Sequence, residues 1–192
     1  MNILGISGSP RKDGNAAYVV QYALQCLAKE GATTRYLSVA GKTIHPCIDC
    51  SKCGEARQCI FEDDIEEFIN ALRCCDGLIS SSPVYFGSVS GQLKTLMDRS
   101  LPLRTGGAFE LSGKLGAGIA CAGFRNGGLE LTLQCMHAFM LIHNMLVIGD
   151  GPGSGHLGAT IVGQAQKDAV GLRTVRGLAH NMISMIEHRR DI

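Results

Sequence analysis

Four cysteines stand close together in the stretch HPCIDCSKCGEARQC, and their spacing is the first feature of the sequence that indicates chemistry. They are Cys47, Cys50, Cys53 and Cys59, which form a C-x2-C-x2-C-x5-C array. Three thiolates, each separated from the next by two other residues, let a short loop wrap a cuboidal iron–sulfur cluster, and a fourth thiolate follows soon after. The bacterial ferredoxin pattern is not matched, because its fourth cysteine precedes a proline, whereas Ile60 follows Cys59.

Two other interpretations of the array stay open. A structural zinc site commonly uses two C-x2-C pairs set far apart, and the compressed spacing suits it less well. A loop of free or partly oxidised thiols is the second, although a reducing compartment disfavours stable disulfides. The array therefore predicts a [4Fe–4S] cluster, with zinc or a metal-free loop as alternatives.

A second stretch, SGSPRKDGN, follows the apolar opening MNILGI and precedes a helical pattern. Ser7 and Ser9 can donate hydroxyl hydrogen bonds, Arg11 can pair with two oxygens at once, and Asn15 can cap the helix or donate to an anion. The positive end of the helix dipole favours the same kind of ligand. The stretch matches neither GxGxxG nor GxxxxGK[ST]. It predicts a phosphate site, with an ordinary solvated turn as the alternative.

A third stretch, SSPVYFGS, ends an apolar run and combines aromatic and aliphatic side chains with free backbone groups. A flat, largely apolar ring needs such a wall, together with backbone donors for its polar edge. The alternative is that Tyr85 and Phe86 only cover the edge of a sheet.

Strand-like apolar runs alternate with helix-length segments around these stretches. The sequence predicts strands at 2–7, 34–39, 77–82, 115–122 and 145–150, and helices at 16–29, 64–74, 88–99, 128–143 and 164–188. Such alternation is typical of a parallel sheet covered by helices on both faces. Because ligands of these sheets lie beyond the carboxyl ends of the strands, we expect one crevice to gather the loops 7–14, 83–88, 121–127 and 149–163. We expect a single domain over 1–192, with a cysteine-rich insertion at about 41–61.

The stretches SGSPRKDGNA and SSPVYFGSVSGQLKTLMDRS resemble the NADPH-dependent FMN reductase-like branch of the flavodoxin-like superfamily, and the cysteine array resembles its iron-sulfur flavoprotein subgroup. The resemblance covers nearly the whole chain. It implies an α/β flavodoxin-like three-layer sandwich with a five-stranded parallel sheet, and it implies FMN and a [4Fe–4S] cluster as cofactors. The cluster ligands would be the four cysteines of the array. The FMN-binding residues that it assigns are Ser7, Ser9, Pro10, Arg11, Asn15 and Ala16, then Pro83, Val84, Tyr85, Phe86 and Gly87, then Ala122, Gly123 and Phe124.

The function implied is a flavin-dependent oxidoreductase in which the cluster passes electrons to FMN and on to a small acceptor. No catalytic side chain is expected, because the flavin carries the chemistry. The resemblance implies ferredoxin or NAD(P)H as donor, and a homodimer or homotetramer with the cluster of one chain near the flavin of another. Two alternatives remain: an NAD(P)H-dependent FMN or quinone reductase without a cluster, and a non-catalytic flavodoxin-like electron shuttle.

Composition and charge limit the kinds of binding partner that we expect. The 192 residues carry 18 Lys and Arg against 17 Asp and Glu, a net charge of +1, so we expect neither nucleic acid nor membrane as a partner. Without a signal-peptide core or an apolar span of about 18 residues, we expect a cytoplasmic protein. The five cysteines outside the array lie in apolar patterns and are predicted to be buried, inert thiols: Cys26, Cys74, Cys75, Cys121 and Cys135.

Overall fold

Strands and helices alternate along the chain in the computed structural model, which describes residues 1–190. The strands are β1 (Asn2–Ser7), β2 (Thr33–Ser38), β3 (Gly77–Pro83), β4 (Leu115–Ala122), β5 (Leu146–Val147) and β6 (Ala159–Val162). The helices are α1 (Asn15–Lys29), α2 (Cys53–Ala56), α3 (Ile65–Cys74), α4 (Gly91–Arg99), α5 (Leu129–Ile142) and α6 (Ala169–Arg190). Three short 3-10 turns complete the set: η1 (Leu101–Leu103), η2 (Thr105–Gly107) and η3 (Ala165–Lys167).

The strands form one parallel sheet in the order β2-β1-β3-β4-β5, with β6 paired to β4 as well. β5 pairs with the start of β4 and β6 with its end, so two short strands share the last position in the sheet. The prediction of a parallel sheet is confirmed, but its fifth strand is interrupted. The glycine-rich segment 149–158 therefore leaves the sheet halfway along β4, and the expectation that it lies beyond the carboxyl ends is wrong; only the segment after β6 does so.

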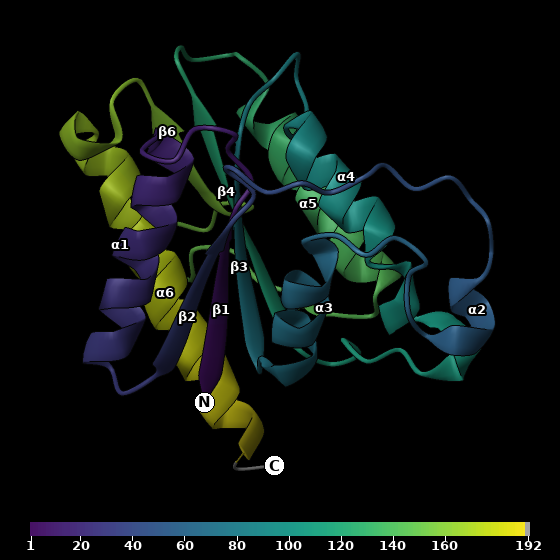
Figure 1. The fold of residues 1–192 in the computed structure, drawn as a ribbon. Helices are drawn as coiled ribbons and strands as arrows, with labels where there is room; N and C mark the ends of the chain where they lie inside the picture. The colour runs from purple at the N-terminus through teal and green to yellow at the C-terminus, as the bar shows by residue number, and fades with distance from the viewer. Residues whose placement is uncertain (191–192) are drawn as a thin grey trace.

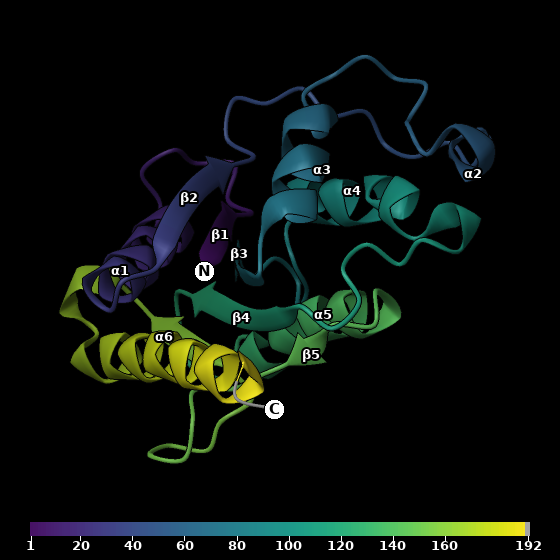
Figure 2. The same cartoon turned by 90° about the horizontal axis from the view of Figure 1, so that it is seen from below.

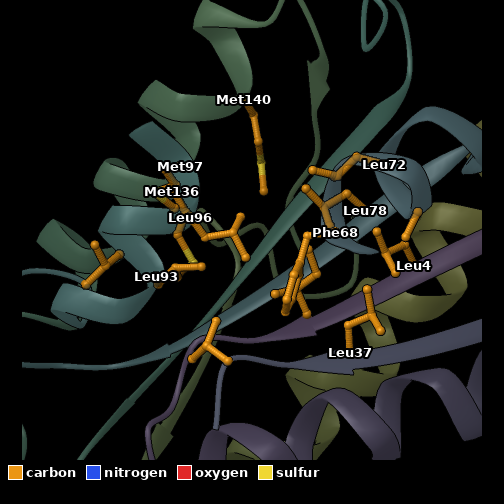
Figure 3. Close-up of a cluster of buried hydrophobic side chains, with 14 of the residues drawn as sticks. Leu4, Leu37, Phe68, Leu72, Leu78, Leu93, Leu96, Met97, Met136 and Met140 are labelled. Carbon is orange, nitrogen blue, oxygen red and sulfur yellow. The ribbon is translucent and has the colours of Figure 1, made fainter. Parts of the chain in front are cut away.

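Helices cover both faces of the sheet, as the sequence pattern predicted. α1 and α6 lie on one face, while α3, α4 and α5 lie on the other (Figures 1 and 2). Side chains alternate between the faces, so that Ile3 packs with α1 and α6 and its neighbour Leu4 packs with the opposite helices. Figure 3 shows the second cluster, in which Phe68 of α3 and Met136 of α5 meet the strands. Within residues 1–190, no helix is both long enough and apolar enough to cross a membrane.

Two glycines let helices approach the sheet closely. A Cβ placed on Gly5 of β1 would lie 2.5 Å from Cγ1 of Val20 in α1. A Cβ on Gly116 of β4 would lie 2.7 Å from Sδ of Met140 in α5. The helices are therefore held at fixed heights above the strands whose carboxyl ends carry the candidate site.

The segment between β2 and α3 departs from the sandwich. It leaves the carboxyl end of β2, passes α4, forms the short helix α2 at the side of the molecule and returns to α3 (Figures 1 and 2). It contains all four cysteines of the array.

Candidate functional site

Backbone hydrogen bonds bring the three predicted flavin loops together at the carboxyl edge of the sheet. The N–H of Gly8, after β1, donates to the carbonyl of Ser81 in β3 at 2.8 Å. The N–H of Val84, after β3, donates to the carbonyl of Cys121 in β4, also at 2.8 Å. The expectation that these loops share one edge is therefore confirmed.

The turn between β1 and α1 combines an uncapped helix start with a hydroxyl and a guanidinium donor. Gly14 is the N-cap of α1 and no side chain caps the helix, so the N–H groups of its first turn have no side-chain partner. Ser9 is buried and its Oγ accepts from the N–H of Arg11 at 3.1 Å, which leaves the hydroxyl hydrogen available. Arg11 is exposed beside it. An uncapped helix start with a hydroxyl and a guanidinium is the arrangement that suits a phosphate.

The side chain of Asn15 connects two loops instead of capping the helix. Its Nδ2 donates to the carbonyl of Gly163 at 2.6 Å, and its Oδ1 accepts from the N–H of Ala165 at 3.1 Å. The side chain thus ties the start of α1 to the loop after β6 and does not cap the helix, while the second N–H of its amide takes no part in these two bonds. Its backbone N–H remains in the first turn with that of Ala16.

A strained turn carries the exposed aromatic residues after β3. Tyr85 and Ser88 exchange backbone hydrogen bonds of 2.9 and 3.1 Å, which places Phe86 and Gly87 at the corner. Phe86 has φ +49° and its side chain is fully exposed. A bulky residue in the left-handed region costs on the order of 1–3 kcal/mol, and such strain concentrates at functional sites. The turn therefore holds an aromatic ring out of the core at this edge.

The loop after β4 touches that turn. Gly128 has φ +99°, and a Cβ there would lie 2.7 Å from Cα of Gly87, so the backbones are in contact. Phe124 is 84% exposed in the same loop, beside the exposed Gly123, whereas Ala122 is buried at the end of β4 and can offer only backbone groups.

Sequence reasoning missed Ser90, which joins two of the loops. Its Oγ accepts from the N–H of Leu93 at 3.1 Å, capping α4, and donates to the carbonyl of Gly8. Its own N–H donates to Oγ of Ser82 at 3.0 Å. A serine directly before a helical pattern is a cap signal that could have been found in the sequence, but the bond to Gly8 could not.

The four cysteines of the array border one cavity, together with Arg99 and Phe61. Asp49 and Ser51, on either side of Cys50, both have positive φ, so the backbone curls tightly around this thiol. A cuboidal cluster needs thiolates that face one shared space, because each of them binds a separate iron corner, and the four cysteines meet this condition. Within residues 1–190, no group of three or more His, Cys, Asp or Glu side chains forms a site for a single metal ion. The residues present therefore fit a [4Fe–4S] cluster.

Burial, and to a smaller degree Cys59, Cys47 and Cys50, raises the pKa of the Cys53 thiol. The other three thiols are thus close enough to Cys53 to affect it, which supports their grouping as one ligand set.

A buried ion pair lies where the two ends of the cysteine segment, the stretch between β2 and α3, come together. Nη1 of Arg99 donates to Oδ2 of Asp63 at 2.9 Å, and Nη2 donates to Oδ1 at 3.1 Å; both side chains are at most 3% exposed. Asp63 also accepts from the N–H of His45 and of Ile65, on the two sides of the segment. Burial alone would raise the pKa of Asp63, but Arg99 and these two N–H groups lower it. The carboxylate therefore joins the beginning and the end of the segment.

The cysteines outside the array only partly match the prediction of buried thiols. Cys75 and Cys121 are buried, and burial raises their pKa values to about 11 and about 12. Cys26 and Cys135 are half-buried. Cys74 is exposed, so its predicted burial is wrong; it is the last residue of α3, where the side chain turns away from the core.

Comparison with known proteins gives the class. The family model of the NADPH-dependent FMN reductases matches residues 1–156. An iron-sulfur flavoprotein of Methanocaldococcus jannaschii is 45% identical over 191 residues, covering 97% of this chain and 98% of that one. An iron-sulfur flavoprotein of Methanosarcina thermophila is 38% identical over 187 residues, covering 97% and 96%. The chain therefore belongs to the NADPH-dependent FMN reductase family and, within it, groups with the iron-sulfur flavoproteins.

Solved structures agree on the fold. An archaeal flavodoxin superposes with a TM-score of 0.64 at 12% identity, covering 98% of this chain and all of that one. An NADH:FMN oxidoreductase in its apo form gives 0.66 at 22% identity, covering 95% and 89%. These structures confirm the prediction of a flavodoxin-like fold, and the match to the FMN reductase family confirms that of a flavin-dependent oxidoreductase.

Proposed function

We propose that this chain is an electron-transfer oxidoreductase that holds FMN at the carboxyl edge of the sheet and a [4Fe–4S] cluster at Cys47, Cys50, Cys53 and Cys59. The observation that carries the proposal is the single cavity bordered by all four cysteines, in a chain whose β1–α1 turn is an uncapped helix start. The names of the two methanogen relatives agree with this pair of cofactors.

The β1–α1 turn would hold the FMN phosphate. Ser7, Ser9 and Arg11 supply hydroxyl and guanidinium donors, Pro10 shapes the turn, and the N–H groups of Asn15 and Ala16 lie at the helix start. Because Asn15 is bound to the loop after β6, the turn is fixed before the ligand arrives. A fixed set of donors loses less entropy on binding than a mobile one.

The second and third loops would hold the flavin ring. Residues 83–87 offer aliphatic and aromatic surface, and the loop 122–124 lies beside them with a further exposed ring at Phe124. When bound, FMN supplies one- and two-electron chemistry and the cluster supplies one-electron chemistry. The protein's part is to orient the ring and to exclude water from one of its faces.

The two cofactor sites lie at opposite ends of α4. Ser90, before the helix, contacts the β1–α1 turn, whereas Arg99, at its end, borders the cysteine cavity. Nine helical residues span about 13 Å. This separation favours an assembly in which the cluster site of one copy lies near the flavin site of a second copy.

Exposed apolar side chains provide a surface for such an assembly. Leu131, Leu141 and Ile142 are 59%, 62% and 56% exposed on α5, which begins beside the exposed Phe124. Apolar patches of this kind mark interaction surfaces in monomers of soluble proteins. We propose a homodimer or homotetramer through this face, with ferredoxin or NAD(P)H as electron donor and a small molecule as acceptor.

Arg11→Ala tests the phosphate site. A hydrogen bond to a charged group contributes about 1.5–3 kcal/mol, so the Kd for FMN should rise roughly 10- to 150-fold. Calorimetry or quenching of flavin fluorescence measures it, with Arg176→Ala on the exposed face of α6 as the control. An unchanged Kd in Arg11→Ala would contradict the assignment.

Cys50→Ala tests the cluster site. The variant should lose its iron and keep its FMN, whereas Cys74→Ala, an exposed thiol outside the array, should keep both. Iron and flavin analysis of protein purified without oxygen gives the answer. Wild-type protein with a pure flavin spectrum and no iron would favour an NAD(P)H-dependent FMN or quinone reductase instead.

A further inference from the structure

We propose that Arg99 is a positioning residue for the cluster, with its Nη groups anchoring the cysteine segment and its Nε–H donating to the Cys59 sulfur. This inference rests on the proposed cluster site. According to this inference, one side chain both helps to retain the cluster and helps to set its reduction potential.

The orientation of the guanidinium is fixed by its neighbours. Nη1 donates to the carbonyl of His45 at 2.6 Å and to Asp63, and Nη2 donates to the other oxygen of Asp63. The ring of Phe61 lies 5.0 Å from Cζ of Arg99. The side chain is 1% exposed, so water does not compete for these groups. Because the Nη groups are bound to Asp63 and His45 and the guanidinium lies near the ring of Phe61, the plane of the guanidinium is fixed. The direction of the Nε–H bond is therefore fixed as well.

The Nε atom is buried and has no hydrogen-bond partner among residues 1–190. An unpaired buried donor costs about 1–3 kcal/mol, more when it is charged, so such groups normally have an acceptor. Arg99 and Cys59 border the same cavity. Burial alone would lower the pKa of Arg99, but Asp63 and, to a smaller degree, Cys59 raise it, so the two side chains are close. A thiolate that ligates iron carries negative charge, and it is a stronger acceptor than the sulfur of the free thiol.

Hydrogen bonds to ligating sulfurs help to set the potential of an iron–sulfur cluster. A donor stabilises the reduced cluster more, because reduction adds one negative charge. Asp63 acts in the opposite sense, since its carboxylate offsets the charge of Arg99. The potential should therefore fall when the donor is lost and rise when the carboxylate is neutralised.

The test uses the anaerobically purified holoprotein with Arg99→Lys, Asp63→Asn and the control Arg104→Lys. Arg104 has its Cζ 5.3 Å from the ring of Phe109 and does not border the cysteine cavity. The readouts are iron and FMN per chain, the rate of iron loss to a chelator, and the cluster midpoint potential in a dithionite titration followed by electron paramagnetic resonance.

Arg99→Lys should lower the potential by about 59 mV, which is a tenfold change for a one-electron couple, and should speed iron loss at least tenfold. Asp63→Asn should raise the potential, and Arg104→Lys should change neither quantity. Loss of iron from Arg99→Lys with FMN retained also supports the proposal.

Wild-type potential and wild-type chelation rate in Arg99→Lys would overturn it, and so would shifts of the same sign in both variants. If Arg99→Lys does not fold, the sign of the shift in Asp63→Asn decides. Wild-type protein without iron would refute the proposed cluster itself, which is a separate outcome.

Discussion

Ser90→Ala should weaken both the fold and the flavin site, because one hydroxyl serves two elements. Its Oγ caps α4 by accepting from the N–H of Leu93, and the loss of such a cap costs about 1 kcal/mol. The same hydroxyl donates to the buried carbonyl of Gly8, and an acceptor left without a partner costs about 1–3 kcal/mol. We therefore expect the free energy of unfolding to fall by about 2–4 kcal/mol.

Urea unfolding of protein stripped of FMN measures this loss without a contribution from ligand binding. At about 3 kcal/mol, the midpoint of thermal unfolding should fall by roughly 6–12 °C for a chain of this size. The Kd for FMN should also rise, because Gly8 orients the turn that carries Ser9. The exposed Ser154→Ala is the control and should change stability by less than about 0.5 kcal/mol. A loss below 1 kcal/mol in Ser90→Ala, with an unchanged Kd, would refute the reasoning.

Two further predictions concern the α5 side of the sheet. Gly116→Val would force a side chain against Sδ of Met140, which lies 2.7 Å from the added Cβ. It should lower the free energy of unfolding, measured in urea, by about 1–3 kcal/mol. The control Gly153→Ala adds a Cβ with no atom within 4 Å and should not lower it. Burial, with a smaller contribution from Arg104, lowers the pKa of His143 to about 4. Because the unfolded chain then binds a proton more readily between pH 4 and 6.5, stability should fall as the pH drops through this window, by about 3 kcal/mol in all. His143→Gln should flatten that dependence; an equal slope in the variant would rule His143 out as its source.

The sequence pattern was sufficient to predict the strands and turns that follow a simple rule, namely an apolar run followed by a glycine-bearing turn. Four of the five predicted strands form close to their predicted bounds; β1, β3 and β4 are largely buried, whereas only Leu37 is buried in the edge strand β2. Glycine-bearing turns follow β1, β3 and β4 at the expected edge. The interrupted last strand was not predictable in this way. β5 has two residues and β6 has four, so neither is long enough to show a strand pattern beside the glycine-rich segment between them.

Contacts between distant residues were beyond the sequence argument. Asp63 directly precedes the predicted helix 64–74, and a carboxylate at a helix start is favourable whatever its partner. Its pairing with Arg99, 36 residues later, depends on how α4 packs beside α3. The task of Asn15 likewise depends on a residue 148 positions away. The spacing of the four cysteines, by contrast, is a local property, and it indicated a shared site before any packing was known.

The most direct test of the account is the analysis of iron, sulfide and flavin in protein purified without oxygen and then incubated with FMN. The account predicts one FMN with about four irons and four sulfides per chain, in line with a single [4Fe–4S] cluster. Protein that takes up no FMN, or that binds FMN but holds neither iron nor sulfide, would contradict it.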